Sequence, residues 1–86
     1  IEALAYLEDL AREHPGKQMI HTRLAEAYRA AGRKADAISQ YDALGEIQLD
    51  AGQIGEAIQT IRTIISMEPP GLEGYHELLR NLEASQ

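Results

Sequence analysis

The stretch that decides the fold is LAEAYRAAGRKADAI at residues 24–38, because LGEIQLDAGQIGEAI at residues 44–58 echoes it twenty positions later. Both stretches start with leucine, have glycine at the ninth position and end in Ala-Ile. Self-similarity inside one chain is typical of domains built from copies of a helix-turn-helix unit. The echo therefore predicts a helical binding scaffold. The alternative is chance similarity between two amphipathic hairpins that share a glycine turn.

Length and composition limit the function classes. The chain has 86 residues, which suits one small domain, residues 1–86, with its own core. Eight Lys and Arg are scattered among fourteen Asp and Glu, giving a net charge of −6 that argues against a nucleic-acid partner. The absence of cysteine fits a reducing compartment, and no apolar run is long enough to cross a membrane. We expect a cytoplasmic protein without membrane contact, and the start at Ile1 suggests a piece of a longer chain.

Apolar residues recur at steps of three and four along five segments, which predicts an all-α fold of five amphipathic helices. The expected helices are residues 1–13, 17–31, 34–51, a fourth from 54 that ends at Met67-Glu68-Pro69-Pro70-Gly71, and a fifth from 72 that frays after 82. Gly32 and Gly52 suit the left-handed conformation that closes a helix. The third helix would be about 27 Å long at 1.5 Å per residue, with Gly45 as its weak point.

The pattern resembles the tetratricopeptide repeat, a helical hairpin of about 34 residues with small residues where its helices cross. One copy is matched best, by His21, Leu24, Ala25 and Tyr28 on its first helix and by Ala37 and Tyr41 on its second. Ala3, Leu7, Leu10 and Pro15 resemble the second helix of a preceding copy, at the family spacing (37 − 3 = 34). Ala57, Ile61, Ile64 and Pro69 resemble another second helix, and Tyr75, Leu78, Leu79 and Leu82 an opening helix.

Small residues at the crossings have a physical reason, since two helices approach to about 8–10 Å only where side chains are short. The positions expected to form the repeat framework are Leu24, Ala25, Tyr28, Gly32, Ala37, Tyr41, Leu44, Gly45, Gly52, Ala57, Ile61 and Pro69. Among them Ala25, Ala37, Gly45 and Ala57 would lie at the crossings.

One spacing departs from the family. Ala57 follows Ala37 by only 20 residues (57 − 37 = 20), and no proline marks a turn between them. We interpret this as a shortened repeat in which residues 34–51 form one fused helix that serves two hairpins. The second and fourth helices would then compete for the same side of that helix, which predicts exchange between two copies in a homodimer. A turn near Gly45 is the alternative.

The sequence offers little support for a catalytic, metal-binding or phosphate-binding site. His14, His21 and Glu13 do not have the spacing that zinc ligands use on a helix, so we expect His14 in a turn and His21 at a helix contact. The acids Glu8, Glu13, Glu46, Asp50, Glu73 and Glu77 are expected on solvated helix faces. The glycines form no phosphate-binding fingerprint. We expect no catalytic residue, metal or cofactor.

Stacked repeats present a concave face built from outward positions of their first helices. By resemblance, the expected partner-binding face comprises Met19, Thr22, Arg23, Glu26, Arg29, Asp42, Glu46, Leu49 and Asp50, continued by His76, Glu77 and Arg80. Family members that clamp a chaperone's C-terminal carboxylate use lysine and asparagine here; Thr22 and Glu26 stand instead, so that clamp is not expected. Acids beside Leu49 and Met19 favour a peptide with positive charge and an apolar anchor. The alternative is a merely solvated face.

The predicted function is a non-catalytic scaffold that binds a partner protein or peptide and self-associates. The alternative is a regulatory or capping module of a larger enzyme or transcriptional regulator, in which the helices serve packing rather than recognition.

Overall fold

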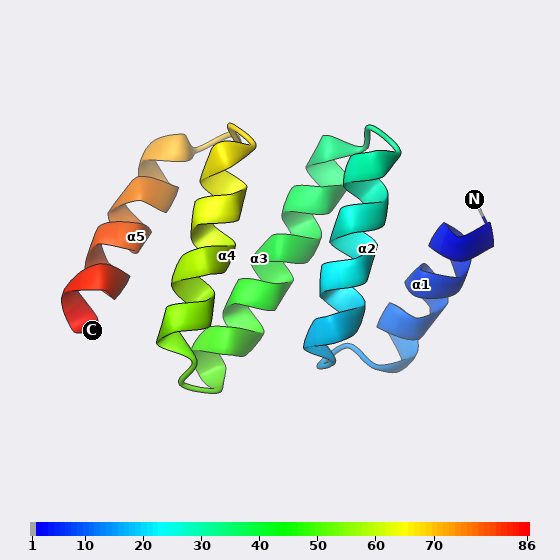
Figure 1. Cartoon of the computed structure of the whole chain (residues 1–86), viewed down its shortest axis with the longest axis horizontal. Helices are drawn as coiled ribbons and strands as arrows, with labels where there is room; N and C mark the ends of the chain where they lie inside the picture. Colours follow the sequence, from blue (N-terminus) through cyan, green and yellow to red (C-terminus); the bar gives the residue numbers. More distant parts are fainter. Residues whose placement is uncertain (1) are drawn as a thin grey trace.

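The computed structural model describes residues 2–86, and the side chains of Glu2 and Ala3 lie outside that description together with Ile1. The described chain forms five helices joined by short turns: α1 (Glu2–Glu13), α2 (Gln18–Ala30), α3 (Lys34–Asp50), α4 (Ile54–Ser66) and α5 (Leu72–Ser85) (Figure 1). No strand occurs within residues 2–86. The predicted all-α class and five helices are confirmed, whereas the roles predicted for Ile1 and the Ala3 side chain fall outside the described residues.

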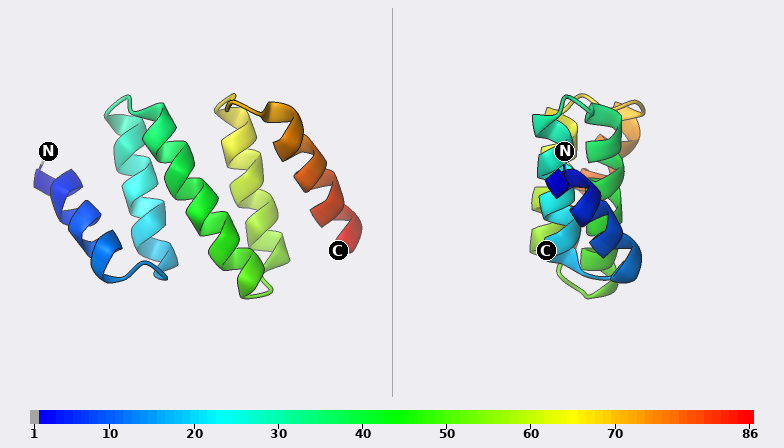
Figure 2. Two further views of the ribbon diagram at one scale, coloured as in Figure 1. Left: turned by 180° about the vertical axis from the view of Figure 1, so that it is seen from behind. Right: turned by 90° about the vertical axis from the view of Figure 1, so that its right-hand side faces the viewer.

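Each helix packs only on its neighbours in sequence, so the chain zigzags along one axis. Viewed along that axis, α2 and α4 lie in one layer and α3 and α5 in the other, with the C-terminal end of α1 on the α3 side (Figure 2). The domain measures 41 × 26 × 14 Å, which describes a thin two-layer slab. No helix among the described residues is long and apolar enough to cross a membrane.

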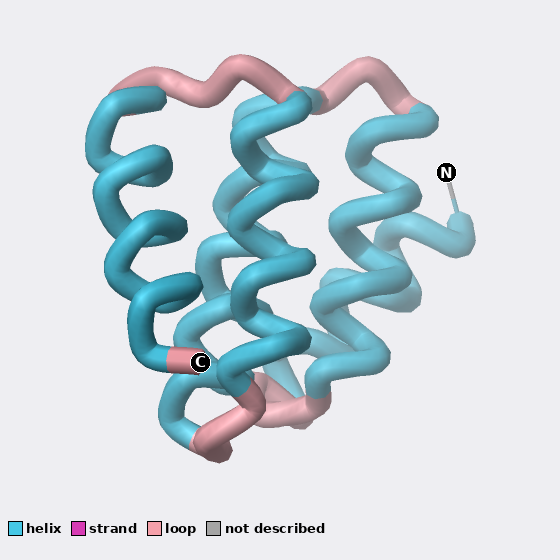
Figure 3. The backbone as a smooth tube through the Cα atoms, turned by 60° about the vertical axis from the view of Figure 1, so that its left-hand side comes forward, coloured by secondary structure: helices cyan, strands magenta, loops and turns pink. Residues whose placement is uncertain are grey.

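The turns after α2 and α3 have the same geometry (Figure 3). Gly32 and Gly52 have φ of 76° and 75°, the left-handed region that a residue with a Cβ disfavours. The next amide closes the helix end in each turn: Arg33 N–H donates to the Tyr28 carbonyl and Gln53 N–H to the Gln48 carbonyl, both at 2.8 Å. Together with the glycine amide bonds at 3.0 Å, these complete a Schellman motif. The two similar stretches of sequence therefore form two turns of the same geometry.

Helix α3 runs unbroken through Gly45, which confirms the prediction of one continuous helix. The alternative, a turn near Gly45, is wrong. Gly45 is buried, and a Cβ there would lie 3.7 Å from Thr60 Cγ2 and 3.8 Å from Ile61 Cδ1. These are ordinary contact distances, so the approach of α4 to α3 leaves room for a residue as small as alanine at position 45. Ala25, Ala37 and Ala57 are fully buried, as small residues at helix crossings would be, and their place at the crossings stays a prediction.

The shortened repeat is wrong. The buried residues of α2 (His21, Leu24, Ala25, Tyr28) reappear on α4 as Ala57, Thr60, Ile61 and Ile64, each 36 positions later (57 − 21 = 36). The sequence resemblance assigns α4 to a second helix of the repeat and α5 to a first, yet α4 lies in the layer of α2 (Figure 2). The 20-residue step is the distance from one turn to the next, and no residues are missing.

The predicted competition between α2 and α4 is also wrong, because both fit beside α3 in a single chain. Ala25 of α2 shares one core cluster with Ile38, Tyr41 and Leu44 of α3 and with the apolar residues of α4. Leu24, Tyr28 and Ala37 form a second cluster, against which Leu4, Leu7 and Ala11 of α1 pack. The packing argument for exchange between two copies no longer applies, and the homodimer stays a prediction.

Hydrogen bonds between polar side chains link α2, α3 and α4 near the turn that joins α3 to α4. Thr60 Oγ1 donates to Gln48 Oε1 at 2.6 Å, and Gln18 Nε2 donates to Gln53 Oε1 at 2.8 Å. Gln48 occupies the position that Tyr28 occupies in the preceding turn. No buried side-chain nitrogen or oxygen in the described residues lacks a hydrogen-bond partner, so these amides are compatible with a stable interior.

Candidate functional site

Two grooves lie along the slab, each flanked by alternate helices with the intervening helix as its floor. The first groove, between α1 and α3 over α2, encloses about 280 Å³ and is lined by Glu8, Ala11, Arg12, His21, Leu24, Tyr28 and Gln40. The second groove, between α3 and α5 over α4, encloses about 320 Å³ and is lined by Asp42, Gly45, Glu46, Leu49, Ile61, Tyr75 and Leu78.

The flanking walls of the two grooves are repeats of one another. Glu8, Ala11 and Arg12 of α1 precede Asp42, Gly45 and Glu46 of α3 by 34 positions each (42 − 8 = 34, 45 − 11 = 34, 46 − 12 = 34). The first pair conserves a carboxylate and the second pair conserves a small residue. The third pair reverses the charge, since arginine in the first groove becomes glutamate in the second.

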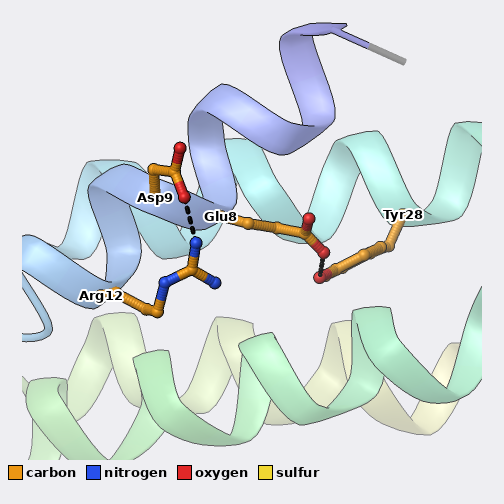
Figure 4. Close-up of polar contacts among 4 residues, drawn as sticks. All are labelled: Glu8, Asp9, Arg12 and Tyr28. Carbon is orange, nitrogen blue, oxygen red and sulfur yellow. Dashed lines mark hydrogen bonds and ion pairs between the residues drawn. The ribbon is translucent and has the colours of Figure 1, made fainter.

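Polar side chains occupy the first groove (Figure 4). The Tyr28 hydroxyl donates to Glu8 Oε2 at 2.5 Å, and Arg12 forms an ion pair with Asp9 one turn earlier on α1. The Arg33 guanidinium lies 4.6 Å from the centre of the Tyr28 ring. Each charged group of the wall therefore has a partner of its own within the chain.

His21 closes the floor of the first groove. Its Nε2 lies 2.6 Å from the Pro15 carbonyl oxygen, and its Nδ1 lies 2.7 Å from the side-chain amide oxygen of Gln40. The ring is buried, with 7% of its surface exposed. His21 thus ties the α1–α2 turn to α3, and the predicted role of this ring at a helix contact is confirmed.

The second groove has an apolar floor and an open acidic wall. Leu49, Ile61 and Leu78 supply the apolar lining, one from each of the three helices. The Tyr75 hydroxyl on α5 reaches across to Asp42 on α3, 2.8 Å from Oδ1 and 2.9 Å from Oδ2. This bond bridges two helices that do not otherwise pack on each other.

Asp42, Glu46 and Asp50 follow one another at steps of four along α3, so their side chains lie on one face of the helix. All three are exposed. None of them forms an ion pair with any residue from 2 to 86. The wall of the second groove therefore carries negative charge that the described chain leaves uncompensated.

Both tyrosine hydroxyls next to these carboxylates are held in the neutral form. Desolvation raises the pKa of Tyr28 to about 12, helped by its hydrogen bond to Glu8. Desolvation likewise raises the pKa of Tyr75 to about 12, helped by its hydrogen bond to Asp42. A tyrosine that donates to a wall carboxylate therefore recurs in both grooves, although Tyr28 comes from the floor and Tyr75 from the opposite wall.

The structure divides the predicted partner-binding face. Asp42, Glu46 and Leu49 come together in the second groove, next to exposed Asp50. Arg29 lines a separate shallow hollow with Lys34 and Met67. The other α2 residues of the prediction, Met19, Thr22, Arg23 and Glu26, line neither groove. His76, Glu77 and Arg80 form a further hollow on α5.

Sequence reasoning missed Tyr75, Leu78 and Ile61 as parts of a groove, because their helical spacing indicated only that they face inward. The signal that could have found the groove is the 34-residue spacing from Glu8 to Asp42, since it assigns α1 and α3 to equivalent walls. The described residues also contain no group of three His, Asp or Glu side chains placed to hold a metal ion.

Comparison with known proteins gives one match. A family described as the bacterial transcriptional activator domain matches residues 1–49, which include α1, α2 and most of α3. No curated protein and no solved structure matches the chain.

Proposed function

Because the chain belongs to the bacterial transcriptional activator domain family, we propose that it is a non-catalytic helical module of a transcriptional regulator that works by contact with another protein. This is the regulator form of our alternative prediction rather than a free-standing scaffold. A module inside a regulator needs no chemistry of its own, and its helices serve to present a surface.

The observation that carries this proposal is the second groove. It combines an apolar floor with exposed, unpaired carboxylates, and it contains three residues of the predicted partner-binding face, Asp42, Glu46 and Leu49. Helical proteins commonly bind a peptide or helix in such a groove through apolar anchors. We therefore propose the second groove as the main site of contact with the partner.

The α2 row of the prediction forms a second candidate surface. Met19 is a large apolar residue with 66% of its surface exposed, and Arg23, Glu26 and Arg29 are exposed on the same helix. We propose that this row contributes to a contact separate from the groove.

Charge supports protein rather than DNA as the direct partner. The net charge of −6 repels a phosphate backbone, and the acids of α3 would lie in any approach to the second groove. DNA contact in the intact regulator is assigned to another part of the protein. A regulator that acts on bacterial transcription works in the cytoplasm, which is the location that we propose.

The test is a reporter assay with the complete regulator. Leu49→Asp places a charge on the apolar floor and is expected to reduce promoter activation while promoter binding, measured by mobility shift, stays unchanged. Tyr6→Ser, at a side chain with 64% of its surface exposed on α1, is the control and should activate normally. Met19→Asp then asks whether the α2 row contributes.

Chemical denaturation of the variant chains shows whether Leu49→Asp still folds. Full activation by a folded Leu49→Asp regulator would contradict the assignment to the groove. Binding of the 86-residue chain itself to duplex DNA at low salt would contradict the assignment to protein contact.

A further inference from the structure

We propose that the second groove binds a positively charged segment of another protein that carries an apolar anchor residue. The inference rests on the proposed function, which names a protein partner, and adds the chemistry of that partner. It is carried by the contrast between the two grooves, which share one architecture and differ in what fills them.

The apolar floor indicates the anchor. Leu49, Ile61 and Leu78 converge from three helices on a space of about 320 Å³, at the small end of the range that ligand pockets occupy. Gly45, which also lines this groove, adds no side chain to it. A space of this size suits one or two apolar side chains rather than a whole folded surface.

The acidic wall indicates the charge. Asp42 and Glu46 lie one helical turn apart, and side chains at that spacing are neighbours on a helix surface. Asp42 is engaged only by the neutral hydroxyl of Tyr75, and Glu46 has no ion-pair partner in the described chain. A guanidinium or ammonium group between the two carboxylates would relieve their mutual repulsion and add a charge-assisted hydrogen bond.

The first groove shows that this charge is not required by the architecture. At the position equivalent to Glu46 it carries Arg12, which is paired with Asp9, and its floor is closed by His21 and its bond to Gln40. Polar side chains thus close the floor of the first groove, and its wall carries an arginine where the second groove has a second carboxylate. The second groove lacks both features, so we assign the external ligand to it alone.

The test measures fluorescence anisotropy of a labelled amphipathic peptide titrated with the 86-residue chain at low salt. The probe carries Arg and Leu four positions apart, and two companions replace Arg with Glu or Leu with Ser. We expect the Arg-Leu peptide to bind. Each companion is expected to bind at least about tenfold more weakly, a difference of about 1.4 kcal/mol.

Glu46→Arg is expected to weaken the Arg-Leu peptide by a similar factor and to restore binding of the Glu-Leu peptide. This exchange of preference is a readout that mere destabilisation of the fold would not produce. The matched control is Arg12→Glu, which makes the opposite exchange at the equivalent position of the first groove. It should change the affinity by less than about twofold, since the first groove contributes no contact.

Four results would overturn the inference. One is an Arg12→Glu effect as large as that of Glu46→Arg, which would indicate attraction by net charge alone. Another is equal binding of the Leu and Ser peptides, which would remove the anchor. The third is self-association in sedimentation experiments that Glu46→Arg abolishes, which would assign the groove to a second copy of this chain. If no peptide binds, this inference fails, while the reporter assay with Leu49→Asp still decides the proposed function.

Discussion

The two grooves have the same walls in the same register, yet polar side chains close the floor of the first groove and apolar side chains line the second. Leu24 and Tyr28 line the first groove and are both buried, with 1% and 6% of their surfaces exposed. On the walls of the second groove Leu49, Tyr75 and Leu78 are half-buried, while Ile61 on its floor is buried, with 4% of its surface exposed. A repeat architecture therefore fixes where a groove forms, and the side chains at equivalent positions decide whether the groove is filled or available.

The largest expected effect is the difference between the two leucines. Leu24→Ala should lower the free energy of unfolding by about 2–5 kcal/mol, because it leaves a cavity in a packed cluster. Leu49→Ala should cost less than about half as much, because part of this side chain already contacts water. Urea denaturation of both variants gives the comparison. Equal losses would mean that the second groove is as closed as the first.

The raised pKa values of Tyr28 and Tyr75 predict how the free energy of unfolding depends on pH. The folded chain raises both pKa values from 10 to about 12, so the neutral hydroxyls stabilise it fully below pH 10. That stabilisation is lost as the pH rises from about 10 through 12, since an ionised Tyr28 or Tyr75 would face a carboxylate.

Comparison of variants isolates this contribution from other groups that titrate at high pH. We expect a smaller fall in the free energy of unfolding between pH 10 and 12 for Tyr28→Phe and for Tyr75→Phe than for the wild type, because each variant removes one group whose pKa the fold raises to about 12. Measurements of the denaturation midpoint across this range provide the check. Identical slopes for wild type and Tyr28→Phe would refute the bond to Glu8 as a stabilising contact.

A smaller effect concerns the small residue in each wall. Gly45→Ala makes the second wall match Ala11 of the first, and the new Cβ would make ordinary contacts at 3.7 and 3.8 Å. Alanine in a helix interior is favoured over glycine by about 0.5–1 kcal/mol, so the variant should be more stable. A destabilised variant in thermal denaturation would show that α3 and α4 tolerate no methyl group at this crossing.

Much of the fold follows from local rules in the sequence. The helix boundaries came from apolar steps of three and four and from Gly32 and Gly52, whose left-handed φ values the structure confirms. The repeat register could not be obtained in this way. Alanine follows each glycine turn at the same distance, at Ala37 and Ala57, so the sequence marks successive turns without marking which layer each helix joins.

The site was predicted in part for a related reason. Periodicity identified Asp42, Glu46 and Leu49 as outward residues, but the groove also depends on Tyr75 and Leu78 from α5. Whether α3 and α5 flank a common space is set by tertiary packing over α4. The exposed α2 row was grouped with α3 because both were assigned to one layer, and the two-layer slab separates them (Figure 2).

The most direct test of the contrast between the grooves is an NMR titration of the 15N-labelled chain with the Arg-Leu peptide. Our account predicts that amide shifts concentrate at Glu46, Leu49 and Leu78, while those of Arg12 and Leu24 stay in place. Shifts centred on the first groove, or spread evenly over the acidic surface, would contradict the claim that only the second groove is open to a partner.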